Sequence, residues 1–167
     1  ACKELGMEDK AFAKAIATFE GAAKRLEFVA HPNPCNIYRD FAHAPSKVNA
    51  SINAVKDQFP DKKLIAVLEL HTFSSLDKNF MSEYRGAMDK ADEAIIFYSK
   101  HALELKRMSF LEPEVVKNGF QKANLVVITE RKNLEEKLKS YSINNTNFLF
   151  MSSGNFDGMN ILTTLNI

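Results

Sequence analysis

The segment Tyr38–Ser46 carries the side chains with the clearest capacity for chemistry, a carboxylate at Asp40 and an imidazole at His43. The segment begins as an alternating strand, breaks into a short loop, and continues into a helix opened by Pro45, because proline suits the first helical turn. Open α/β sheets bind ligands where a strand ends beside a helix N-terminus, since the N–H groups there favour phosphate or carboxylate. The pair therefore predicts a site for an anionic ligand.

These residues also have plainer structural interpretations. An aspartate before a helix often caps the turn, so Asp40 could be structural. Arg25 could pair with Glu27 or Asp40 at a strand edge, and Lys47 could be an ordinary solvated lysine. Imidazoles titrate near physiological pH, which suits His43 to holding a phosphate or carboxylate. The residues alone leave these alternatives open.

Polar side chains also follow two apolar runs, residues 64–70 and 148–151, that have the pattern of strands buried on both faces. Carboxyl ends of parallel strands meet at one sheet edge, so these loops are expected in the same crevice as Asp40. An ordinary polar loop is an equally good interpretation of residues 71–75. We predict ligand-binding side chains at His71, Ser74, Ser75, Ser152, Ser153 and Asn155.

The order of apolar patterns predicts the fold that positions these loops. Residues 26–31 and 36–41 alternate as short strands around a turn too short for a helical crossover, which favours a hairpin. Strands alternating with helical segments in the second half require parallel crossovers. We expect a three-layer, Rossmann-like α/β sandwich with a mostly parallel mixed sheet. Its buried strands are expected at residues 64–68, 94–98, 125–128 and 148–151.

Helical periodicity accounts for the remaining segments. An amphipathic helix is predicted over residues 8–18, ending near Gly21, and another from Pro45 to a stop at Pro60. Asp77 is the expected N-cap of a third helix. His31 and His101 have no partner pattern and are expected at the surface.

Composition excludes several classes of function. The chain has 167 residues, 46% of them hydrophobic, which is enough for one sizeable core. A net charge of +1, from 22 basic and 21 acidic residues, gives no electrostatic case for nucleic acid or a membrane surface. Two cysteines, Cys2 and Cys35, without a CxxC spacing favour a reducing, cytoplasmic location and no bound metal. The chain has no P-loop that could hold the triphosphate of ATP by itself.

Several motifs resemble those of the Mur ligases, ATP-dependent enzymes that build peptidoglycan peptides. The C-terminal domain of that family opens with Phe-x-Gly, Arg-x-Glu and a strand ending in Asp-Phe-Ala-His-x-Pro, found here at Phe19–Gly21, Arg25–Glu27 and Asp40–Pro45. Met151–Gly158 is similar to the closing Met-Ser-x-Gly-x-Phe-x-Gly loop of the murein peptide ligase branch. Residues 68–75 stand at the position of the family's central loop, so the resemblance covers nearly the whole chain.

The resemblance implies a role for each group of residues. Asp40 would lie near the ATP ribose, because a carboxylate can accept hydrogen bonds from the ribose hydroxyls. Arg25 would reach the nucleotide, because the fork of a guanidinium suits phosphate oxygens. His43 would be the catalytic histidine, and the residues of the 71–75 and 152–155 loops would bind the substrate. The family usually has a second histidine where Ala44 stands, and an arginine near His71.

The resemblance also implies a larger protein. Absent N-terminal and central domains would complete the enzyme, with ATP and Mg²⁺ bound mainly by the central domain and UDP-N-acetylmuramate as the acyl substrate. Residues 1–167 would then be a single domain excised from a longer chain, positioning a peptide acceptor and closing over the site, without turnover of its own. A stand-alone, non-catalytic module that binds a nucleotide or another small anion needs the same sheet and remains the alternative.

Overall fold

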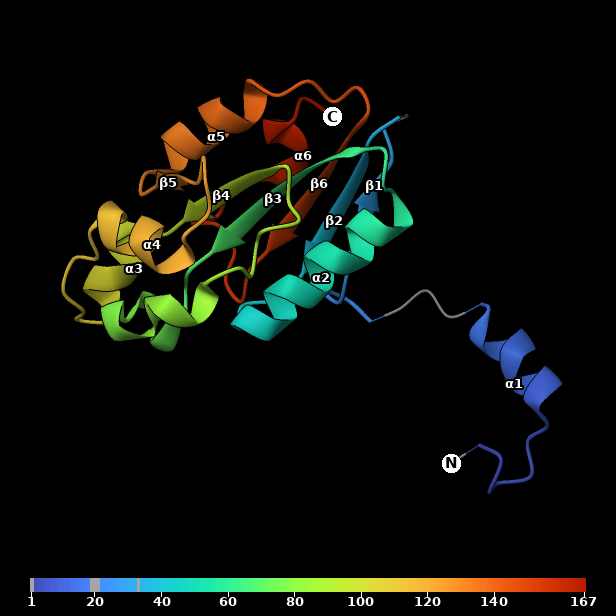
Figure 1. Cartoon of the computed structure of the whole chain (residues 1–167). Coiled ribbons are helices and arrows are strands. Elements are labelled where there is room, and N and C mark those ends of the chain that lie inside the picture. The colour runs from blue at the N-terminus through green and yellow to red at the C-terminus, as the bar shows by residue number, and fades with distance from the viewer. Residues whose placement is uncertain (1, 19–21, 33) are drawn as a thin grey trace.

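A computed structural model describes residues 2–18, 22–32 and 34–167. Six strands form one mixed sheet in the order β1-β2-β6-β3-β4-β5 (Figure 1). β1 runs antiparallel to β2, as the predicted hairpin requires, and every other neighbouring pair is parallel. The strands are β1 Glu27–Ala30, β2 Asn36–Asp40, β3 Lys63–Glu69, β4 Glu93–Phe97, β5 Val126–Ile128 and β6 Thr146–Met151.

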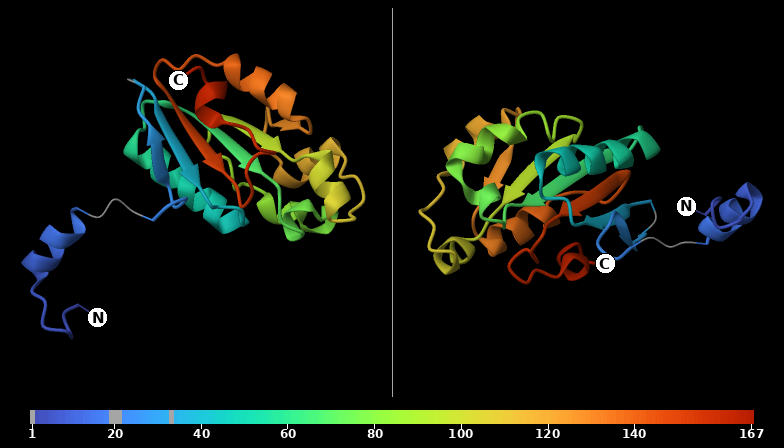
Figure 2. Two further views of the ribbon diagram at one scale, coloured as in Figure 1. Left: turned by 180° about the vertical axis from the view of Figure 1, so that it is seen from behind. Right: turned by 90° about the horizontal axis from the view of Figure 1, so that it is seen from below.

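Helices cover both faces of this sheet, so the predicted three-layer sandwich is confirmed (Figure 2). On one face lie α2 (Pro45–Gln58), the 3-10 helix η2 (Lys78–Tyr84) and α4 (Pro113–Phe120). The other face is covered by α5 (Arg131–Lys139) and α6 (Ile161–Thr164). Two short elements follow strand ends, η1 (Ser74–Leu76) and α3 (Lys100–Leu105).

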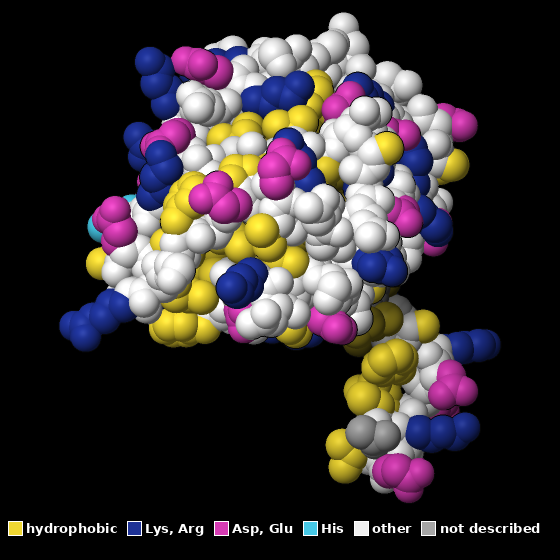
Figure 3. Space-filling model, turned by 60° about the vertical axis from the view of Figure 1, so that its left-hand side comes forward, with side chains coloured by type: hydrophobic (Ala, Val, Ile, Leu, Met, Phe, Trp, Pro, Cys, Tyr) yellow, Lys and Arg dark blue, Asp and Glu magenta, His cyan; other side chains and the backbone are white. Residues whose placement is uncertain are grey.

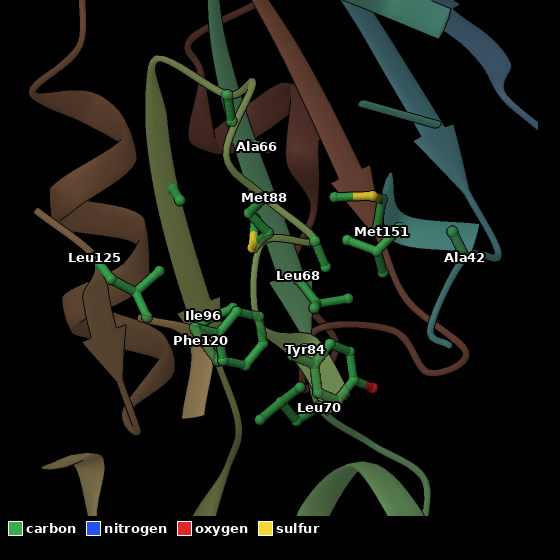
Figure 4. Close-up of a cluster of buried hydrophobic side chains, with 14 of the residues drawn as sticks. Ala42, Ala66, Leu68, Leu70, Tyr84, Met88, Ile96, Phe120, Leu125 and Met151 are labelled. Atoms are coloured by element: carbon green, nitrogen blue, oxygen red, sulfur yellow. The ribbon is translucent and has the colours of Figure 1, made fainter. Parts of the chain in front are cut away.

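Close packing of η2 against α4 completes the larger core (Figure 4). The rings of Tyr84 and Phe120 stack with centroids 4.7 Å apart, over strand residues such as Leu68 and Ile96. Gly119 permits this approach, because a Cβ at that position would lie 2.5 Å from the Cβ of Met81. Burying each large apolar side chain stabilises the fold by about 1.5–3 kcal/mol.

The helix expected after Asp77 differs from the prediction, because it is a 3-10 helix rather than an α-helix. Asp77 does cap it, accepting a hydrogen bond from the N–H of Asn79 at 2.9 Å. Side chains three residues apart eclipse in a 3-10 helix, so Met81 and Tyr84 are buried together. Gly86, at φ +74°, follows in a left-handed conformation that ends the helical path.

Helix α1 (Asp9–Ile16) stands apart from the sandwich (Figure 1). The helix was predicted, but none of its residues is buried, and Phe12 and Ile16 are 43% and 50% exposed. Its hydrophobic and charged side chains lie on different sides of the segment (Figure 3). The predicted end near Gly21 lies outside the described residues. No helix in the described ranges is long and apolar enough to cross a membrane.

Candidate functional site

The carboxyl ends of β2, β6 and β3 are adjacent at one edge of the sheet, and hydrogen bonds join the loops that follow them. The N–H of Ser152, directly after β6, donates to the carbonyl oxygen of Asp40 at 2.9 Å. The hydroxyl of Ser152 donates to the carboxylate of Glu69 at the end of β3. The convergence predicted for the three loops is therefore present, and two cavities open along it.

The first cavity, here called the Asp40 cavity, has a volume of about 250 Å³. Asp40 is buried at 8% exposure, and its Oδ2 accepts a hydrogen bond from the hydroxyl of Ser51 on α2. Arg25 is exposed, with its guanidinium 5.3 Å from the centre of the Phe41 ring. Lys47 also lines the cavity. Two cations and one fixed carboxylate therefore surround the same space.

Lys47 is exposed, as an ordinary solvated lysine would be, whereas the capping bond considered for Asp40 and the ion pair considered for Arg25 are absent among the described residues. The N-cap of α2 is Ala44, which makes no side-chain capping bond, so Asp40 does not cap this helix. Arg25 forms no ion pair with Glu27 or Asp40 in the described part of the chain. Glu27 instead accepts a hydrogen bond from the N–H of Lys24 at 2.9 Å.

His43 is half-buried beside the N-terminus of α2. Its Nδ1 lies 2.8 Å from the carbonyl oxygen of Phe41, and because a carbonyl oxygen only accepts, Nδ1 is the donor of this bond. The hydroxyl of Tyr84 donates to the carbonyl oxygen of His43. Burial raises the pKa of Tyr84, so this phenol stays protonated and continues to donate. The loop that carries His43 is thus fixed at both ends.

The second cavity, here called the Glu69 cavity, has a volume of about 240 Å³ and includes His71, His101, Lys106, Asn155 and Asp157. The Nδ1 of His71 lies 3.8 Å from the carboxylate of Glu69. This nitrogen and the hydroxyl of Ser153 are buried atoms without a hydrogen bond to any described residue. Buried polar atoms are usually paired, so these two are exceptions among the described residues.

Glu69 organises this second cavity and was not among the predicted site residues. It is 3% exposed and accepts hydrogen bonds from the hydroxyl of Ser152 and, at 2.9 Å, from the N–H of Phe156. Gly154 crosses so close that a Cβ there would lie 2.8 Å from Glu69 Oε2 and from His71 Cγ. The sequence feature that could have identified Glu69 is its position as a charged residue at the end of a continuous apolar strand. His101 is exposed, as predicted, and it lines this cavity together with Lys106, the C-cap of α3, which was not predicted there.

The predicted serines and Asn155 fall into different environments. Ser75 is buried, and its hydroxyl donates to the carbonyl oxygen of Thr72 at 3.0 Å, so it shapes its own turn. Ser74 is exposed, with its hydroxyl 3.3 Å from that of Thr72. Asn155 lines the Glu69 cavity, and its Oδ1 accepts from the N–H of Gly158 at 3.2 Å. Within the described residues, no three His, Cys, Asp or Glu side chains are grouped to hold a metal ion.

Residues 24–154 match the family described as "Mur ligase, glutamate ligase domain". The chain belongs to the Mur ligase family. This match includes all residues that line the Asp40 cavity and all that line the Glu69 cavity except Asn155 and Asp157. The motif Phe19–Gly21, on which part of the resemblance rested, lies outside the described residues.

Individual Mur ligases align with the chain as part of a larger protein. UDP-N-acetylmuramate–L-alanine ligase of Paenarthrobacter aurescens is 34% identical over 93 residues, which are 56% of this chain and 20% of that protein. The murein peptide ligase of Psychrobacter arcticus aligns with a TM-score of 0.69 and 20% identity, over 99% of this chain and 35% of that one. The MurF ligase of Thermotoga maritima in complex with ADP aligns with a TM-score of 0.64 and 18% identity, over 99% and 34%. The chain thus spans about a fifth of the curated relative.

Proposed function

We propose that this chain is the C-terminal, substrate-binding and lid domain of a cytoplasmic, ATP-dependent ligase that joins a peptide to UDP-N-acetylmuramate for peptidoglycan. The observation that carries the proposal is the pair of cavities at one sheet edge, linked through Ser152. One cavity offers groups for a nucleotide and the other offers groups for a peptide. A ligase needs both ligands side by side, because orientation of the reacting groups supplies much of the rate.

The nucleotide half is supported by the side chains of the Asp40 cavity. Arg25 and Lys47 are donors that suit phosphate oxygens, and the Asp40 oxygen that does not bond Ser51 can accept a ribose hydroxyl. The ADP complex of the MurF relative supports a nucleotide ligand. ATP supplies the phosphoryl group that activates the muramoyl carboxylate. Since the chain has no P-loop, the triphosphate and Mg²⁺ would be held mainly by an absent central domain.

The acceptor half is supported by the Glu69 cavity. His71, Asn155 and Lys106 present donors toward one space, and Asp157 adds a carboxylate. A peptide brings several carboxylates and amides that need such donors, whereas free L-alanine needs fewer. Ser74 and Ser153 would bond the peptide, while Ser75 and Ser152 would act by holding the loops. His43, which lines neither cavity and whose Nδ1 donates to the carbonyl oxygen of Phe41, would be the catalytic histidine.

Domain closure is the proposed role of the whole chain. Residues 1–167 would form a single domain of a longer protein, and its closure on the central domain would exclude water from an activated acyl group. The isolated chain would therefore have no turnover.

The test is ligation by the full-length protein that contains this chain. With ATP, UDP-N-acetylmuramate and L-alanyl-γ-D-glutamyl-meso-diaminopimelate, mass spectrometry should detect the UDP-muramoyl peptide in equal amount to the ADP released. The isolated chain should yield none and should bind ATP no more tightly than about 1 mM, or −4 kcal/mol. Micromolar affinity of the isolated chain, without ligation by the full-length protein, would instead identify the stand-alone binding module.

A further inference from the structure

A third cavity, larger than the two described above, lies on the opposite side of β2 from the Asp40 cavity. Its volume is about 460 Å³, within the range of small-molecule sites. Adjacent residues of a strand point to opposite faces, so Arg39 faces this cavity while Asp40 faces the other. We call this space the Arg39 cavity. Neither the proposed nucleotide nor the proposed acceptor occupies it.

Arg39 is an unusual residue for its position. It lies within a five-residue strand, half-buried, and its neighbours in register are Glu27 on β1 and Phe150 on β6. Within the described ranges its guanidinium forms no hydrogen bond or ion pair, and the Glu27 carboxylate accepts from the N–H of Lys24 instead. A guanidinium has five donors and loses free energy when they are taken from water without a partner. An anion in the cavity would supply that partner.

The walls around Arg39 determine what else the anion must carry. Val29 on β1 and Met159, Ile161 and Leu162 at α6 provide apolar surface on several sides. Asn160 is already used as the cap of α6, where its side chain accepts from the N–H of Thr163. A fully hydrated inorganic ion would leave these apolar walls without contacts. A ligand with an apolar body and a single anionic group satisfies both the walls and the arginine.

We propose that the Arg39 cavity binds a small amphiphilic organic anion, with its carboxylate, sulfonate or phosphate paired to Arg39 and its apolar body packed against α6. Glu27 also lines the cavity, and its carboxylate accepts from the N–H of Lys24. The turn Asn155–Gly158 borders this cavity and the Glu69 cavity alike. A ligand in the Arg39 cavity is therefore expected to contact the turn that also borders the proposed acceptor site.

The test uses the 167-residue chain and two fluorescent probes of similar shape, anionic 1-anilinonaphthalene-8-sulfonate and neutral N-phenyl-1-naphthylamine. Fluorescence titration gives the affinity, and methyl NMR spectra give the location. We expect one saturable sulfonate site with shifts at Val29, Met159 and Ile161. Arg39→Met should weaken sulfonate binding about tenfold, the size of one charge-assisted contact. Arg39→Lys should weaken it less, and Arg85→Met, on the exposed end of η2, should have no effect.

Several results would overturn the proposal. They are shifts centred on the exposed face of α1, the absence of saturable binding, equal affinity of the neutral probe, and unchanged affinity in a folded Arg39→Met protein. Arg39→Lys keeps the charge and is expected to keep the fold. If Arg39→Met does not fold, the affinities of the lysine variant and of the neutral probe still test the proposal.

Discussion

The carboxylate of Glu69 accepts a hydrogen bond from the backbone N–H of Phe156 at 2.9 Å, which joins the end of β3 to the loop after β6. Phe156 and Asp157 have left-handed φ angles of 54° and 55°, which side chains rarely adopt. Phe156 is nonetheless buried, with its ring against Phe97 and Phe150. The Glu69 bond and this packing together hold a loop that the backbone would not adopt by itself.

Replacing Glu69 should therefore lower stability. Glu69→Ala leaves the N–H of Phe156 buried without an acceptor, so the free energy of unfolding should fall by about 1–3 kcal/mol. Glu69→Gln keeps an acceptor oxygen and should lose less, and Glu83→Ala on the exposed part of η2 is the matched control. Urea unfolding of the 167-residue chain measures all three. Equal stability of Glu69→Ala and the control would show that the loop does not depend on this carboxylate.

Asp40 should affect the nucleotide rather than the fold. Asp40→Asn keeps an oxygen for the Ser51 hydroxyl but removes the charge and one acceptor of a ribose hydroxyl. In the full-length ligase we expect the KM for ATP to rise about tenfold, equivalent to about 1.4 kcal/mol, with the peptide KM unchanged and the Tm within about 3 °C of wild type. Asp61→Asn, an exposed carboxylate, is the control. A lower Tm with an unchanged KM for ATP would show that Asp40 has a structural role instead.

The strands, and the edge of the sheet where the three loops meet, could be predicted from the sequence, because both depend on the local pattern of apolar residues. Continuous apolar runs located β3, β4, β5 and β6 to within about two residues. The loops were correctly expected at one edge, since parallel strands have no other arrangement. The hairpin followed from the short turn between β1 and β2.

Features that depend on distant contacts could not be predicted. Glu69 is a charged residue in an apolar run. Its structural role depends on a hydrogen bond from the N–H of Phe156, which lies far along the chain. The 3-10 helix η2 packs against Gly119 of α4, a contact far along the chain that its local sequence does not reveal. The buried hydrogen bonds of Ser75 distinguish it from the exposed Ser74, and sequence alone treats the two alike.

Helix α1 should contribute nothing to the stability of the sandwich, because none of its residues is buried. A chain of residues 22–167 should melt cooperatively and within about 2 °C of the 167-residue chain. Phe120→Ala in the larger core should cost about 3–5 kcal/mol and serves as the positive control. Circular dichroism melts measure both. A large fall in Tm on removal of α1 would mean that the helix packs on the sandwich in solution.

The four tyrosines should resist ionisation. Burial raises the pKa of Tyr98 and of Tyr141 to about 12, and also raises the pKa of Tyr38 and Tyr84. The neutral phenols therefore stabilise the fold fully below pH 10, and this stability is lost as the pH rises toward about 12. Absorbance at 295 nm should stay flat through pH 10 and then rise together with unfolding. A separate transition near pH 10 in the folded protein would contradict this.

The choice between a peptide and free L-alanine by the full-length protein is the most decisive measurement of its function. Initial rates with UDP-N-acetylmuramate, ATP and either L-alanyl-γ-D-glutamyl-meso-diaminopimelate or L-alanine give two values of kcat/KM. The account predicts that the peptide value is higher by at least about a hundredfold, or about 2.7 kcal/mol, because the Glu69 cavity presents more donors than alanine can use. A preference for L-alanine would contradict the peptide assignment, and absence of ATP-dependent ligation with either acceptor would contradict the ligase itself.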